Sequence, residues 1–147
     1  MNKKELINIL SEVLIPFGFK RKGNYWVING NEIAKMVNLQ KSNYGNFFYI
    51  NYGYILKSIP LDNEMMHVYN RVTSLDLEER NRITFLLDLD SNVADEDRTI
   101  ELKQIFGKQL VSKIQVVNTE EELLKELKGH SDLNNIPLTV KKHFQIE

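Results

Sequence analysis

Residues 18–26 read GFKRKGNYW, residues 33–40 read IAKMVNLQ and residues 47–56 read FFYINYGYIL. The last two stretches are rich in β-branched, aromatic and aliphatic residues, which favour extended strands. Gly23 and Asn24 interrupt the first stretch, and both tolerate the positive φ that a tight turn between two strands requires. We therefore expect this part of the chain to form an antiparallel β-meander.

Helical patterns flank the meander on both sides. Residues 2–17 repeat apolar side chains at the spacing of a core-facing helix, and Asn2 is its expected N-cap. Residues 95–111 combine an acidic start with an apolar stripe, residues 119–127 open with a capping-box signature, and residues 138–144 fit a last short helix. The sequence thus predicts an N-terminal helix and two to three C-terminal helices.

Two segments lie between these patterns. Residues 65–75 fit either a fourth strand or a short helix, and as a strand they place His67, Tyr69 and Arg71 on one face. Residues 82–89 alternate apolar with mostly polar side chains, which predicts a further strand.

The fold class follows from this order of elements. We expect a single α+β domain over residues 1–147, with an antiparallel sheet of four to six strands. The C-terminal helices should cover one face of this sheet and leave the other partly open.

The composition excludes several kinds of site. The chain of 147 residues has no cysteine, which rules out disulfides, thiolate catalysis and cysteine-based zinc sites. Its three histidines lack zinc spacing, and its seven glycines are spread singly instead of forming a phosphate-binding loop. Residues 88–92 begin like a calcium loop, but Val93 and Thr99 replace the turn glycine and the bidentate glutamate. We therefore expect no metal and no cofactor.

Targeting signals are also missing from the pattern. The first five residues lead into an amphipathic segment, and no stretch approaches the ~18 apolar residues of a membrane span. The expected location is the cytoplasm.

Charge is distributed unevenly along the chain. Residues 1–60 carry eight basic and three acidic side chains, whereas residues 61–147 carry eleven and seventeen. Such a split can offer an acidic face to a basic partner. It can equally reflect the solvated charges that helices usually carry.

Four pieces of the sequence, in order, resemble a bacterial family known as domain of unknown function 4304 (DUF4304). The pieces are GFKRKGNYW at 18–26, VNLQKS at 37–42, FYINYG at 48–53 and HVYNRV at 67–72. The resemblance covers roughly residues 5–90 and implies no established chemistry. Many small bacterial families of this kind act as immunity proteins beside secreted toxins, and by analogy the same role is one hypothesis for this chain.

His67 and Arg71 are the most obvious candidates for catalysis. Four residues apart, they share a face whether the segment is a helix or a strand. A histidine can act as a general base and an arginine can hold an anion. The alternative is that both anchor a loop or a sheet edge through hydrogen bonds.

Gln40, Ser42 and Asn51 lie on neighbouring expected strands. Gln40 and Ser42 share a face, but the direction of Asn51 depends on a strand register that the sequence does not set. With Lys41 they could line a polar groove, or they could satisfy backbone groups at a strand end. Gly53 indicates a bulge or a close backbone approach.

Aromatic residues and cations alternate through the meander, as in proteins that bind single-stranded nucleic acid. A net charge of −1 and a pI near 6.3 argue against affinity based on phosphate contacts. Nucleic acid is therefore not the expected partner.

The leading hypothesis is a non-enzymatic protein-binding module, in the form of an immunity protein that neutralises a cognate bacterial toxin. Two alternatives remain: a small hydrolase or transferase that uses His67 and Arg71, and a scaffold or oligomerisation module. The candidate binding surface consists of Trp26, Gln40, Lys41, Ser42, Tyr49, Asn51, His67 and Arg71.

Overall fold

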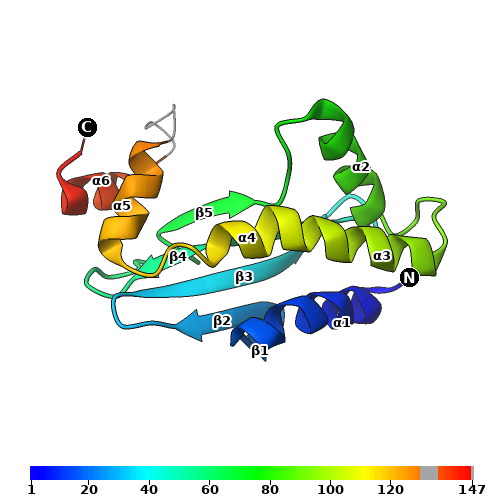
Figure 1. The fold of residues 1–147 in the computed structure, drawn as a ribbon, viewed down its shortest axis with the longest axis horizontal. Helices are drawn as coiled ribbons and strands as arrows, with labels where there is room; N and C mark the ends of the chain where they lie inside the picture. The colour runs from blue at the N-terminus through cyan, green and yellow to red at the C-terminus, as the bar shows by residue number, and fades with distance from the viewer. Residues whose placement is uncertain (130–135, 147) are drawn as a thin grey trace.

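A computed structural model describes residues 1–129 and 136–146 (Figure 1). Its strands form one antiparallel sheet in the order β1-β2-β3-β4-β5. The strands are β1 (Lys20–Lys22), β2 (Tyr25–Asn29), β3 (Ile33–Lys41), β4 (Phe48–Leu56) and β5 (Val68–Arg71). The helices are α1 (Lys3–Leu14), η1 (Ile15–Phe17), α2 (Leu77–Leu87), α3 (Asp95–Phe106), η2 (Gly107–Val111), α4 (Ser112–Ile114), α5 (Glu120–Lys128) and α6 (Leu138–Phe144).

The predicted α+β class, N-terminal helix and meander are confirmed. Asn2 caps α1 by accepting a hydrogen bond from the backbone N–H of Glu5 at 2.9 Å. Gly18 ends the helical segment with a left-handed φ of 97°. The turn at Gly23 has a φ of 61°, as its sequence predicts.

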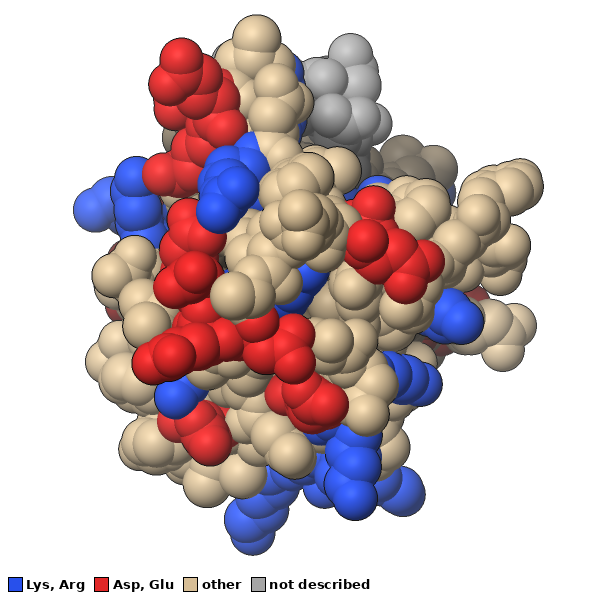
Figure 2. Space-filling view, turned by 90° about the vertical axis from the view of Figure 1, so that its right-hand side faces the viewer, with Lys and Arg blue, Asp and Glu red and all other residues tan. Residues whose placement is uncertain are grey.

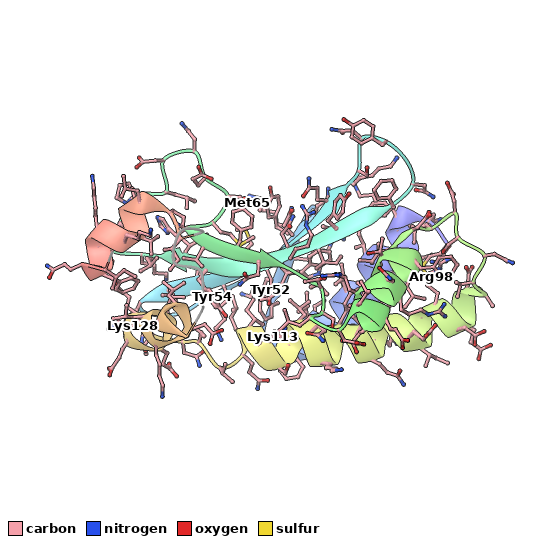
Figure 3. The ribbon with its side chains drawn as sticks, turned by 90° about the horizontal axis from the view of Figure 1, so that it is seen from above. Tyr52, Tyr54, Met65, Arg98, Lys113 and Lys128 are labelled. Carbon is pink, nitrogen blue, oxygen red and sulfur yellow. The ribbon has the colours of Figure 1, made fainter. Side chains whose placement is uncertain are left out.

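Helices cover one face of the sheet. α1 and the continuous rod of α3, η2 and α4 lie along this face, which Figures 1 and 3 show from two directions. Because side chains alternate along a strand, the register places on this face a set of apolar residues that are all buried. They include Trp26, Val37, Leu39, Ile50 and Leu56.

The predicted strand at residues 82–89 is wrong, because this segment is helical. Asp76 caps α2 by accepting from the N–H of Glu79 at 3.1 Å, and its buried residues then follow helical spacing. These residues are Ile83, Leu86 and Leu87. Phe85, which fits a period of two, is left 42% exposed.

The ambiguous segment at residues 65–75 contains strand β5. It pairs with β4, and Gly53 makes this pairing possible, because a Cβ there would lie 2.0 Å from the carbonyl oxygen of Val68. The sequence-based expectation of a close backbone approach at Gly53 is therefore confirmed.

A buried arginine fixes the connection from α2 to α3 through hydrogen bonds to backbone carbonyls. Arg98 is 1% exposed and donates to the backbone carbonyls of Leu86 (2.6 Å), Asp88 (3.0 Å) and Ser91 (2.8 Å). Figure 3 shows it where these two helices meet.

The three expected C-terminal helical segments are present as α3–η2–α4, α5 and α6. None of the described helices is both long enough and apolar enough to cross a membrane.

Two tyrosines of β4 point beneath the helices. Tyr52 and Tyr54 lie between the sheet and α4 in Figure 3, and both are buried. Tyr54 donates a hydrogen bond to the carbonyl oxygen of Lys113 at 3.5 Å. Burial, with a smaller contribution from Glu126, raises the pKa of both phenols above their usual value.

The close approach at Gly53 generates a first prediction. Gly53→Ala should lower the free energy of unfolding by about 3 kcal/mol, because the new methyl group overlaps the backbone of β5. Gly107→Ala is the matched control, because a Cβ there meets nothing within 4 Å and the backbone is helical. It should stabilise the protein by about 0.5 kcal/mol. Urea denaturation measures both values, and equal stability of the two variants would contradict the steric explanation.

The buried tyrosines predict a loss of stability at alkaline pH. The unfolded chain ionises its tyrosines from about pH 10, whereas the folded chain holds Tyr54 protonated to higher pH. The stability that burial of the neutral phenol provides is therefore present below pH 10 and declines above it. In Tyr54→Phe the free energy of unfolding should fall less steeply between about pH 10 and 11 than in the wild type. Lys35, whose pKa burial lowers, is present in both proteins and cancels in the comparison. Parallel pH profiles would contradict this prediction.

Candidate functional site

The side of the sheet opposite the helices is largely exposed, and we call it the open face. Register and alternation place the following residues on it. They are Lys20, Lys22, Tyr25, Val27, Asn29, Ala34, Met36, Asn38, Gln40, Tyr49, Asn51, Gly53, Ile55, Tyr69 and Arg71. The expectation that one sheet face stays partly open is confirmed.

One row of polar side chains crosses all five strands on the open face. Cα pairing joins Lys22 to Tyr25, Tyr25 to Asn38, Asn38 to Asn51, and Asn51 to Arg71. Side chains directly opposite one another on neighbouring strands are close enough to interact. The register therefore brings residues from distant parts of the sequence into contact.

Asn51 is the centre of a hydrogen-bonded group on this face. Its Nδ2 donates to Oδ1 of Asn38 at 3.2 Å and to Oε1 of Gln40 at 3.0 Å. Its Oδ1 accepts from Nε of Arg71 at 3.4 Å. Asn51 is 3% exposed, so these bonds satisfy a polar group that is out of reach of bulk water.

Tyr49 supports Arg71 from a second direction. The guanidinium carbon of Arg71 lies 3.9 Å from the centroid of the Tyr49 ring, which is a cation–π contact. The Tyr49 ring also packs edge-on against Phe47, with 5.9 Å between the ring centroids. We call the five residues Asn38, Gln40, Tyr49, Asn51 and Arg71 the polar cluster. Among the residues that the structure describes, Arg71 forms no ion pair.

The open face presents large exposed side chains on several strands. Tyr69 is 53% exposed and Tyr25 is 37% exposed, and both lie on it. Met65, in the segment that joins β4 to β5, lies on the same side of the sheet (Figure 3). Two hollows of about 420 and 360 Å³ lie elsewhere, between the end of α4 and α5 and between α2 and α3. The open face therefore resembles a protein contact surface more than a small-molecule site.

His67 is placed as a structural residue and does not join the polar cluster. Its ring is 4% exposed, Nδ1 accepts from the N–H of Leu56 at 2.9 Å, and Nε2 lies 2.9 Å from the carbonyl oxygen of Pro60. The tautomer with its proton on Nε2 satisfies both contacts. Since both ring nitrogens are used by backbone groups, the predicted partnership of His67 with Arg71 is not formed.

Three further predicted residues also lie off the open face or at its end. Trp26 is 0% exposed, because its strand parity turns it toward α1, where Nε1 donates to Oγ of Ser11 at 3.1 Å. Ser42 is buried beyond β3 and its Oγ accepts from the N–H of Tyr44 at 3.1 Å, which stabilises the loop to β4. Lys41 is exposed at the end of β3 and has the opposite parity to Gln40.

The structure brings together Gln40, Tyr49, Asn51 and Arg71, and it adds Asn38. Sequence reasoning missed Asn38, although its alternation with Gln40 was a usable signal. Tyr69 was assigned to the same face as Arg71 but was not proposed as a contact residue.

The open face and the surface over α2 and the start of α3 carry opposite charge. Among its paired strand residues, the open face carries Lys20, Lys22 and Arg71 and no carboxylate. Figure 2 shows acidic side chains gathered over α2, the loop after it and the start of α3. Among the described residues, no three acidic or histidine side chains are grouped in a way that could hold a metal ion.

The role of His67 can be tested by stability. His67→Ala should lower the free energy of unfolding by about 2 to 3 kcal/mol, because it leaves a buried N–H and a carbonyl without partners. Nitrogen NMR shifts of the wild-type ring should show the proton on Nε2. Unchanged stability in this variant would contradict the structural role.

Comparison with known proteins places the chain in one family. The sequence model of the family described as "Domain of unknown function (DUF4304)" matches residues 10–129. No curated protein and no solved structure matches the chain. The match extends beyond residue 90, where the resemblance was expected to end, and includes α2 to α5 as well as the whole polar cluster. Because it covers well over half of the sequence, the protein belongs to the DUF4304 family.

Proposed function

We propose that this protein is a non-enzymatic binding module whose open face contacts another protein. As its specific form we propose an immunity protein that neutralises a cognate bacterial toxin in the cytoplasm. The observation that supports a binding role best is the polar cluster, an ordered group of side chains on the uncovered face of the sheet.

Two properties of the open face favour protein recognition. Its exposed tyrosines offer large contact area with few rotatable bonds, as in the energetic centres of many interfaces. The polar cluster is held by hydrogen bonds and a cation–π contact before any partner arrives, which reduces the entropy lost on binding. A rigid sheet surface with both properties suits a partner of complementary shape.

The charge distribution would orient the partner. The open face is positive, whereas the surface over α2 and the start of α3 is acidic. A partner that meets the open face through an acidic segment is attracted there and repelled from the helical end. A basic partner would instead approach the acidic surface, so variants on the two surfaces distinguish the two orientations.

Co-expression with a toxin domain encoded beside this gene tests the proposal. The toxin domain alone should stop growth, and co-expression should restore growth and yield a stoichiometric complex. If the toxin domain is equally lethal with and without this protein and no complex forms, the immunity role is wrong.

Variants locate the contact surface. Tyr69→Ala should weaken the complex by at least about tenfold, because an exposed tyrosine at an interface centre commonly contributes that much. Val116→Ala is the control: Val116 is also exposed, at 59%, but follows α4 on the helical side. Calorimetric titration measures both affinities, and thermal unfolding shows that both variants remain folded. An equal loss in the two variants would contradict binding through the open face.

The same purified proteins also test the two alternative functions, an oligomerisation module and a small enzyme. A homodimer in solution that Tyr69→Ala dissociates would replace the proposal with an oligomerisation module. Turnover of a small molecule that is lost in Arg71→Gln would replace it with a hydrolase or a transferase.

A further inference from the structure

The direction of every hydrogen bond in the polar cluster follows from Arg71. A guanidinium donates and cannot accept, so the atom of Asn51 that faces Nε of Arg71 must be its oxygen. The NH₂ of Asn51 therefore points the other way, toward its two amide neighbours. Asn38 and Gln40 accept this NH₂ through their oxygens, which turns their own NH₂ groups away from Asn51.

Arg71, Asn38 and Gln40 consequently keep donor groups that the internal bonds of the cluster do not use. The terminal nitrogens of Arg71 and the NH₂ groups of Asn38 and Gln40 take no part in the internal bonds. Within residues 1–129 and 136–146, no carboxylate pairs with Arg71. Gln40 and Arg71 are exposed, so their donors are accessible to a partner, whereas Asn38 is only 8% exposed.

The guanidinium is also held in one orientation. Its central carbon lies over the Tyr49 ring and its Nε donates to Asn51, so its terminal nitrogens lose little freedom when a ligand binds. A planar pair of oxygens matches the two parallel N–H groups of such a guanidinium.

We propose that the terminal nitrogens of Arg71, with the amide groups of Gln40 and Asn38, form a receptor for an aspartate or glutamate carboxylate of the partner protein. This inference rests on the proposed function, because it names the chemical group that the open face recognises. The paired strand positions of the open face carry Lys20, Lys22 and Arg71 and no acidic residue, and this positive charge complements such a group. A phosphate polymer fits less well, because the protein has a net charge of −1 and offers few cations on this face.

Titration of the full-length protein with small probes tests the receptor without the partner. The ¹⁵N-labelled protein is titrated with a blocked Gly-Glu-Gly peptide and with a blocked Gly-Gln-Gly peptide, which has the same shape but no charge. The Glu peptide should produce saturable shifts of the Arg71 Nε–H and of the side-chain NH₂ signals of Asn38 and Gln40. The Gln peptide should not.

Two variants and a control identify the geometry that is needed. Arg71→Gln removes the charge, and Arg71→Lys keeps the charge but lacks the planar fork, so both should weaken binding of the Glu peptide by at least about tenfold. Lys113→Gln removes a positive charge from an exposed position of α4, on the helical side of the sheet, and it should change affinity by less than about twofold. Backbone amide spectra show whether each variant keeps its fold.

Several results would overturn the receptor. These are equal shifts with both peptides, full affinity in Arg71→Lys, or saturation by inorganic phosphate with no response to the Glu peptide. The last result would assign the donors to a phosphate group instead. A toxin complex that tolerates Arg71→Lys would overturn the receptor but leave the proposed function standing. Binding of the Glu peptide by a protein that forms no complex with the toxin would overturn the immunity role but leave the carboxylate receptor standing.

Discussion

The backbone ladder between β3 and β4 decides what the open face displays, because it places Asn38 opposite Asn51. A slip of one residue would turn Asn51 under the helices and expose the side chain of Ile50 or Tyr52 instead. Burial of the apolar side chains on the helical face opposes such a slip, since each would lose about 1.5 to 3 kcal/mol on exposure. The hydrophobic core therefore also holds the polar cluster in register, although none of its side chains belongs to the cluster.

The position of Arg71 depends on how closely β5 lies against β4. Gly53 permits this approach by having no side chain, and His67 continues the edge by accepting the N–H of Leu56 just beyond the strand pairing. Both residues are structural, yet each determines where the guanidinium lies relative to Asn51. His67 lies four residues from Arg71 and therefore resembles a catalytic partner in the sequence. In the structure its ring instead bonds backbone groups beside β5.

Local signals predicted most of the fold, whereas the site depends on long-range pairing. Turn glycines, helix caps and periodicity identified α1, the meander and the C-terminal helices. The segment at 82–89 was misjudged because eight residues fit two periods, and the cap at Asp76 that settles the matter lies outside it. The side on which Asn51 lies follows only from its pairing with another strand. Trp26 was misplaced for the same reason, because aromatic character does not tell which face of a strand is covered.

The energetics of Arg71 suggest why it is held in place. Ordering an arginine side chain costs up to about 2 kcal/mol of conformational entropy. Its exposed contact with Tyr49 contributes about 0.5 to 1 kcal/mol, and its long bond to Asn51 contributes at most about 1 kcal/mol. These contributions roughly cancel, so folding gains little from this conformation, and a smaller donor would satisfy Asn51 equally well. The contacts with Tyr49 and Asn51 already offset the entropy cost of this conformation, so an acceptor on the terminal nitrogens adds its full contribution, which is the reason to regard the ordered guanidinium as a binding group.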